Sequence, residues 1–333
     1  MQRNKIAVVI GMLFMMILLA ACGSNSGTEG NDVNAESNTN GGENVVSSEP
    51  ATRTITHLRG ESTVPVNIER AVVLSAAYID HLLTIGEKPY AVNVELRYGG
   101  DYPAYLADQL EGVHLVGSAD SPNLEAITEL DPDVIVIESR TADEVYTQLE
   151  KIAPTIVLGT EWLDYEDDTT YWTKDLLKIA ELYGKEDAAK QKIAELEAKT
   201  AQAKLKIDAL EDKRLAYLRV RDKTVQIYAQ TGHPINSFLY HDLGFVPTAL
   251  TPESQREDIS LEVIPQLDAN YLVLEVDPNG QENLKTIKES SLWKPVPAVQ
   301  KEQVFETDSY WLFKGWGVIG RGQIIDDLMS WLD

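Results

Sequence analysis

The chain has 333 residues and a formal net charge of −24 at pH 7, with 53 acidic residues against 29 basic ones. This excess of acids argues against a nucleic-acid-binding protein, because recognition of the phosphate backbone needs a basic surface. The length suits two domains of ordinary size, and hydrophobic residues make up 44% of the chain, which is enough for substantial cores.

Residues 1–21 have the pattern of a secretory signal peptide. Arg3 and Lys5 form a short basic region, residues 6–19 are almost wholly apolar, and Leu-Ala-Ala precedes Cys22. About 20 apolar residues are needed to cross a bilayer, so an uncleaved membrane anchor is the less favoured alternative. The sequence around Cys22, the only cysteine, resembles the lipobox of bacterial lipoproteins. That resemblance implies cleavage before Cys22 and a lipid on its sulfur, which holds a protein at a membrane without spanning it.

Residues 22–52 are predicted to form a flexible linker. They are rich in Gly, Ser, Asn, Thr and Glu and contain few apolar residues. Such a segment cannot bury enough surface to fold. We therefore expect a lipid-anchored tether that lets the folded body move over the membrane.

Residues 53–165 alternate between short apolar strands and helices, which predicts an α/β lobe with a largely parallel sheet. The predicted strands cover residues 71–74, 90–94, 134–137 and 155–158, and the predicted helices cover residues 78–83, 124–130 and 145–152. The 134–137 segment is continuously apolar, as expected when both faces of a parallel strand are covered.

A helical spine is predicted over residues 166–212, and a second α/β lobe over residues 213–333. Gly184 interrupts the helical pattern, so we expect two helices or one kinked helix there. In the second lobe, strands are predicted at 215–220, 224–228 and 271–275, and helices at 236–243 and 319–332.

An internal repeat relates the two lobes. Residues 123–138 and 260–275 are identical at seven of sixteen aligned positions, and Asn123 and Ser260 are the matching N-cap candidates. In each copy a short helix and a buried strand are expected. Chance similarity between two short apolar motifs is the alternative. The repeat predicts an α/β fold of two similar Rossmann-like lobes bridged by a long α-helix.

The motifs at residues 122–127, 130–136, 151–155 and 324–328 resemble those of the iron-siderophore and cobalamin binding proteins of ATP-driven importers. The resemblance covers about residues 53–333. It implies a substrate-binding lipoprotein that captures a ferric siderophore, of hydroxamate or citrate type, in a shallow cleft between the lobes and delivers it to an ABC permease. A haem or cobalamin carrier with a more apolar cleft is one alternative. An extracytoplasmic enzyme or adhesion module is the other.

Four arginines are candidates for holding an anionic chelate. Arg97, beside Tyr98, follows the second predicted strand, and Arg140 follows the third, where open α/β sheets bind ligands. Arg219 and Arg221 are two apart on one strand and so project from one face. Arginine stays charged and donates in a planar fork to carboxylate or hydroxamate oxygens. The resemblance implies basic residues at the positions of Arg97, Arg140 and Arg219. Ion pairing with the abundant acids is the alternative for each arginine.

The segment 310–314 supplies further candidates. The resemblance implies that Trp311 lies beside the cleft, with Tyr310 and Lys314 as weaker ligand contacts. A place in the core is the alternative for Trp311.

Glu125 and Glu262 occupy equivalent positions in the repeat. The resemblance implies that each docks into an arginine pocket of a permease subunit, which would give charge-steered recognition. Alternatively, each is only a first-turn carboxylate favoured by the helix dipole.

No catalytic residue, metal site or cofactor is predicted. The five histidines show no metal-ligand spacing, and the nucleophile and phosphate-loop motifs are absent from the sequence. We expect a monomer on the extracytoplasmic face of the cell membrane. The lipobox and the long linker favour a Gram-positive surface over a periplasm.

Overall fold

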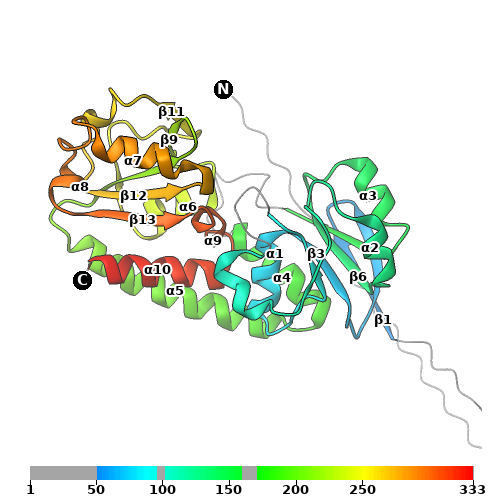
Figure 1. Ribbon diagram of the computed structural model, residues 1–333. Coiled ribbons are helices and arrows are strands. Elements are labelled where there is room, and N and C mark those ends of the chain that lie inside the picture. The colour runs from blue at the N-terminus through cyan, green and yellow to red at the C-terminus, as the bar shows by residue number, and fades with distance from the viewer. Residues whose placement is uncertain (1–50, 96–101, 160–170, 333) are drawn as a thin grey trace, which may run out of the picture. The chain divides into compact units, whose positions relative to one another are not determined.

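A computed structural model describes residues 51–95, 102–159 and 171–332 of the chain, apart from the Tyr171 side chain (Figure 1). The first elements are an antiparallel hairpin, β1 (Thr52–His57) and β2 (Gly60–Pro65), which the sequence analysis did not predict. The hairpin joins the first lobe through a hydrogen bond from the Leu58 amide to the Val157 carbonyl, 3.0 Å long.

The first sheet is wholly parallel and has the strand order β5-β4-β3-β6-β7. Its side chains alternate between two cores, as the pleat of a strand requires. Val72 and Leu74 pack with Ile127 and Leu149 of the helices on one face, and Val73 packs in the core that includes the spine. The elements are β3 (Ala71–Leu74), α1 (Ala76–Thr84), β4 (Ala91–Val92), η2 (Ala104–Gln109), β5 (His114–Leu115), α2 (Leu124–Glu129), β6 (Val134–Glu138), α3 (Asp143–Leu149) and β7 (Thr155–Leu158).

The second sheet is mixed, with the strand order β11-β9-β8-β12-β13, and β10 also pairs with β8. The strands β8, β12 and β13 are parallel to one another, whereas β9 returns antiparallel after a tight turn. Its elements are β8 (Arg214–Val220), β9 (Val225–Ile227), α6 (Pro234–Ser237), η4 (Phe238–Asp242), β10 (Val246–Pro247), β11 (Glu257–Ile259), η5 (Ile264–Gln266), β12 (Tyr271–Val276), η6 (Pro278–Gly280), α7 (Gln281–Glu289), α8 (Pro297–Gln300) and β13 (Val304–Asp308).

The spine consists of two helices, α4 (Tyr171–Tyr183) and α5 (Glu186–Asp208), and Gly184 separates them with a φ of +63°. After α9 (Trp311–Lys314), the last helix α10 (Val318–Leu332) packs against α5 and against α1 of the first lobe. No helix in the described part of the chain is long and apolar enough to cross a membrane. Together, the two sheets and the long helix confirm the predicted α/β class, and the predicted domain boundaries remain predictions.

A carboxylate of the first lobe caps the last helix. Asp80 of α1 is fully buried, and its two oxygens accept hydrogen bonds from the backbone amides of Ile319 (3.1 Å) and Gly320 (2.8 Å). These amides belong to the first turn of α10, whose N–H groups have no partner within the helix. Burial raises the pKa of Asp80 to about 6, although the two amides oppose this rise.

Two predicted helices differ in the structure. The second copy of the repeat has turns and the short η5 after Ser260 instead of an α-helix, because Pro265 has no N–H to donate to the preceding turn. The predicted 236–243 helix is α6 followed by a π-helical turn, in which the Leu243 amide donates to the Phe238 carbonyl at 2.8 Å. The first copy forms α2 as expected, and Asn123 caps it by accepting from the Ala126 amide at 3.1 Å.

Candidate ligand-binding site

Arg140 lies just beyond the C-terminal end of β6. Its Nε donates to Glu138, and its Nη1 lies 3.2 Å from Asp120 Oδ1. Burial acts to lower the pKa of Arg140, but Glu138, Asp120 and Glu95 outweigh it and raise that pKa above its ordinary value. The guanidinium therefore stays charged, and carboxylates already surround it.

Arg219 lies on β8 with only 7% of its surface exposed. Its Nε and Nη2 donate to the two carboxylate oxygens of Asp277 at 2.8 and 3.0 Å, which is the bidentate geometry that suits arginine. The Glu275 carboxyl lies 3.5 Å from the same Nε. Arg221, two residues further on, lies 3.7 Å from Asp277 and shares it as a partner.

The Glu275 carboxyl group is fully buried beside Arg219. Burial raises its pKa to about 8, and the neighbouring carboxylates Asp277 and Asp308 add to the rise. Glu275 therefore holds a proton at neutral pH. It is hydrogen-bonded to the hydroxyl of Tyr217, whose ring stacks on Tyr228 with centroids 4.2 Å apart.

The residues of segment 310–314 make two kinds of contact: one with the first lobe and the others with α10. The Tyr310 hydroxyl donates to the Glu95 carbonyl of the first lobe at 3.4 Å. Trp311 is 0% exposed, and its Nε1 donates to Asp327 of α10 at 3.3 Å. The Lys314 ammonium donates to the same carboxylate at 3.2 Å. In this conformation Trp311 and Lys314 face the α10 side of the core, as the core alternative for Trp311 requires.

A cavity of about 520 Å³ lies at the C-terminal ends of β12 and β13. Tyr102 and Ala104 of the first lobe line one side. The remaining lining comes from Val276, Pro278, Gln281, Glu306, Thr307, Asp308, Ser309 and Tyr310. The lining thus combines backbone, hydroxyl and carboxylate groups, and Glu306 is paired with Lys288.

The carboxylates of this region are functional candidates that the sequence analysis missed. Glu275 and Asp277 end a buried apolar strand in the same way as Glu138 and Arg140 do, and that position was the available signal. Asp308 ends the neighbouring strand. Each of the three described candidate arginines, Arg140, Arg219 and Arg221, therefore lies within ion-pair distance of at least one carboxylate.

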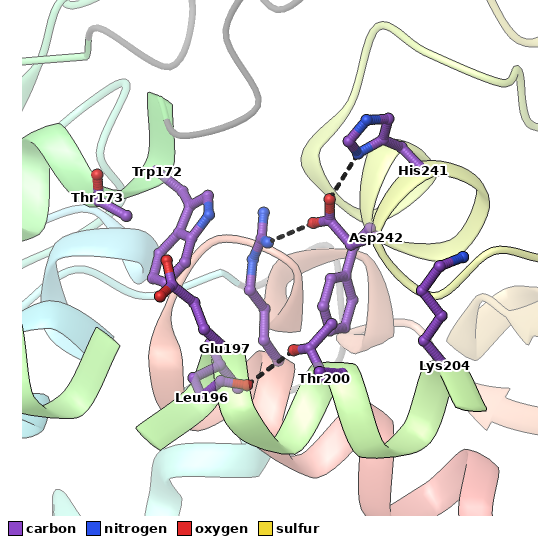
Figure 2. A pocket seen from close by; sticks show the side chains of 11 residues that line it. Trp172, Thr173, Leu196, Glu197, Thr200, Lys204, His241 and Asp242 are labelled. Atoms are coloured by element: carbon purple, nitrogen blue, oxygen red, sulfur yellow. Dashed lines mark hydrogen bonds and ion pairs between the residues drawn. The ribbon is translucent and has the colours of Figure 1, made fainter. Parts of the chain in front are cut away.

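A second cavity, of about 360 Å³, lies between α4, α5, η4 and α10 (Figure 2). Arg321 crosses its floor between the rings of Trp172 and Phe238, at 4.6 and 4.7 Å from their centroids. Its Nε donates to the Gly315 carbonyl at 2.7 Å and its Nη1 to Asp242 at 3.1 Å. Figure 2 shows the contact between Asp242 and His241, whose Nδ1 lies 2.8 Å from Asp242 Oδ1. Arg321 therefore joins helices, and its charge is already matched.

Other predicted residues lie elsewhere. Arg97, Tyr98 and Cys22 are outside the described residues. Glu125 is exposed in the first turn of α2, and Glu262 is exposed before η5, where the Ser260 hydroxyl lowers its pKa. The described ranges contain no cluster of His, Cys, Asp or Glu side chains suited to a metal ion.

Comparisons with known proteins identify relatives over most of the chain. Residues 72–311 match the family described as periplasmic binding protein. A Bacillus subtilis protein named as a probable siderophore-binding lipoprotein is 28% identical, with 99% of this chain and 98% of that protein aligned. An iron(3+)-hydroxamate-binding protein of the same organism is also 28% identical, over 92% and 90%. The crystal structure of Staphylococcus aureus SirA with staphyloferrin B has a TM-score of 0.65 and 25% identity, and the alignment covers 84% of this chain and 98% of that one.

Proposed function

This chain belongs to the periplasmic binding protein family, and we propose that it captures a ferric siderophore outside the cell and delivers it to the permease of an ABC importer. Members of this family bind solutes for transport. The names of the relatives support a ferric chelate as the ligand, since one binds iron(3+)-hydroxamate and another is crystallised with staphyloferrin B. The protein needs no catalytic residue and no resident cofactor for this role.

The observation that carries the proposal is that the candidate arginines and a cavity both lie at the C-terminal ends of strands. Arg140 follows β6, Arg219 lies near the C-terminal end of β8, and Arg221 directly follows β8. The 520 Å³ cavity opens at the ends of the two neighbouring strands and has Tyr102 of the first lobe on its wall. Ligands of open α/β sheets bind at such edges. Planar guanidinium groups there are suited to hydroxamate or carboxylate oxygens.

The carboxylates around the arginines favour a chelate of low net charge. Asp277 and Glu138 already accept the strongest hydrogen bonds of Arg219 and Arg140. A trianionic ferric complex would meet these carboxylates as well as the arginines, and like charges at short range are unfavourable. A neutral ferric hydroxamate, or a citrate-type chelate of small charge, suits such a surface better. The polar lining also argues against haem or cobalamin, which would need a more apolar cleft.

The remaining parts of the proposal concern the membrane and the permease. A lipid on Cys22 and the 22–52 linker would hold a monomeric body at the extracytoplasmic face, on a Gram-positive surface. Glu125 and Glu262, both exposed, would dock onto the two permease subunits. Each lobe would then supply one acidic contact.

A fluorescence titration tests the binding function, with the tryptophans as reporters. We expect quenching by a ferric hydroxamate or ferric citrate-type siderophore, and at least a tenfold loss of affinity in Arg140→Gln. Arg70→Gln, which changes an arginine paired with Asp131 at the opposite end of the first sheet, is the matched control and should bind normally. The absence of quenching by every ferric chelate tested would refute the proposal, as would growth of a deletion strain on those iron sources.

A further inference from the structure

Residues 315–321, which we call the strap, lead from the end of α9 into the first turn of α10. They follow the second sheet in the chain, yet α10 packs against α1 of the first lobe as well as against the spine helix α5 (Figure 1). Along the chain, the two sheets are connected once, by the segment that contains α4 and α5. The strap and α10 therefore form a second, non-covalent connection between the lobes.

Glycines at positions 315 and 317 let the strap pass close to a helix of each lobe. A Cβ on Gly315 would lie 2.8 Å from the backbone nitrogen of Ile235 in α6. A Cβ on Gly317 would collide with the carboxylate of Asp80 in α1. Both glycines are buried, and neither has a positive φ, so the missing side chain serves close packing rather than an unusual backbone conformation.

On the first-lobe side, hydrogen bonds hold both the strap and the turn that follows it. The two oxygens of Asp80 accept from two amides of the first turn of α10, at 3.1 and 2.8 Å. Gln323, just after the strap, donates from Nε2 to the Tyr105 carbonyl of η2 at 3.1 Å. The first residue of η2, Ala104, lines the 520 Å³ cavity. The first-lobe wall of that cavity is therefore bonded to α10.

On the second-lobe side, Arg321 fastens the strap. Its Nε donates to the Gly315 carbonyl at 2.7 Å, and its Nη1 donates to Asp242 of η4 at 3.1 Å. The guanidinium lies between the rings of Trp172 from α4 and Phe238 from η4. Because Arg321 is only 2% exposed, its release would leave a buried charge without these partners, which is costly. One guanidinium thus holds the spine, the second lobe and the strap together.

The strap also continues the segment that lines the candidate ligand cavity. Ser309 and Tyr310 line the 520 Å³ cavity, and α9, which has 4 residues, separates them from the strap. The Tyr310 hydroxyl donates to the Glu95 carbonyl of the first lobe at 3.4 Å. The strap itself is not among the described residues that line the cavity. A displaced strap would nevertheless move one wall of the cavity relative to the other.

We propose that the strap positions the walls of the candidate ligand cavity, and that Asp80 and Arg321 are positioning residues for chelate capture, a role that rests on the proposed function. A strap fastened to both lobes keeps the protein in the arrangement that captures the chelate. A loosened strap lets the protein spend time in other arrangements. The apparent dissociation constant then rises by the inverse of the fraction of molecules that remain competent.

Gly317→Ala tests the strap, with Gly322→Ala in α10 as the matched control. The first methyl group collides with Asp80, whereas the second has only an ordinary contact, 3.8 Å from the Lys199 ammonium. Distances between the lobes are measured by double electron–electron resonance. We expect Gly317→Ala to broaden the distance distribution and Gly322→Ala to leave it unchanged.

The spin labels are attached at Lys151→Cys and Lys294→Cys, two exposed positions, one in each lobe. The full chain carries Cys22→Ser, so that these are its only thiols. Loading with a gallium(III) chelate, which is not paramagnetic as the ferric one is, gives the distance of the competent arrangement. The fraction of each variant found at that distance without ligand is the competent fraction.

Affinity is measured on the same variants by calorimetric titration with a ferric trihydroxamate and with ferric citrate. A competent fraction of about one tenth in Gly317→Ala should raise the dissociation constant about tenfold. Asp80→Asn keeps the size of the side chain but offers one acceptor oxygen in place of two, so it should fold and show both effects more weakly. Leu149→Ala, in a separate core of the first lobe, lowers stability away from the strap and should change neither the distances nor the affinity.

The outcomes separate the strap from the proposed function. Unchanged distances in both Gly317→Ala and Asp80→Asn overturn the inference, and so does a broadened distribution that leaves the affinity at the wild-type value. Equal effects in Leu149→Ala would also overturn it, because they would follow from lost stability alone. If the wild type binds a ferric chelate in any of these cases, the proposed function stands. A wild type that binds none of the ferric chelates refutes the proposed function and, with it, the role in capture.

Discussion

Replacement of Asp80 by asparagine should change how the stability of the protein depends on pH. Asp80 is fully buried and has a pKa of about 6, against an ordinary value of 3.8. Between these values the unfolded chain releases the proton while the folded protein keeps it. The wild type therefore loses stability as the pH rises from about 3.8 to about 6. At 1.36 kcal/mol per pH unit, the loss is about 3 kcal/mol.

The assay is urea unfolding of the wild type and Asp80→Asn from pH 3.5 to 7.5, followed by tryptophan fluorescence. The free energy of unfolding of the variant, relative to the wild type, should rise by about 3 kcal/mol across this range. The neighbouring His81 has the opposite dependence, because burial lowers its pKa to about 3, but it is present in both proteins and cancels in the difference. Parallel profiles would show that Asp80 titrates normally and would refute the argument.

Two further predictions use matched controls. Asp277→Asn leaves the buried Arg219 guanidinium without its bidentate partner and should cost about 3 kcal/mol of stability, whereas Asp212→Asn, which breaks a similar pair near the surface, should cost under about 1 kcal/mol in the same urea assay. Equal costs would contradict this. Gly232→Ala should lower the melting temperature more than Gly112→Ala. Both glycines have positive φ, but only a Cβ at Gly232 would collide with a backbone atom, the Ser254 carbonyl oxygen. Equal shifts would rule out the clash.

The sequence was sufficient for the elements whose causes are local. The apolar run at 134–137, the break at Gly184 and the cap at Asn123 each depend on residues a few positions apart, and each is found in the structure. The π-helical turn after α6 and the loss of the second repeat helix at Pro265 depend on finer geometry. Periodicity alone does not distinguish such turns from an α-helix.

The sequence indicated which arginines are candidates for the site, but not which carboxylates they pair with. An arginine after a buried strand indicates a ligand edge, which is how Arg140 was identified, whereas Arg219 was identified by its spacing of two from Arg221 on one strand. Their partners depend on which strands are neighbours. Arg219 lies opposite Glu275 only because β8 and β12 pair in parallel register, although the two residues are 56 positions apart in the chain (275 minus 219). A repeat between the lobes does not contain that information.

The bond between Asp80 and α10 has a consequence for how the protein is made. Residue 80 is synthesised well before residues 319 and 320, whose amides its carboxylate accepts. Domains fold as their residues become available during synthesis, N-terminal parts first. Until residues 319 and 320 have been synthesised, the carboxylate of Asp80 therefore lacks the two amides that it accepts from in the folded protein. We expect the packing of α1 around Asp80 to be completed only after α10 has been made.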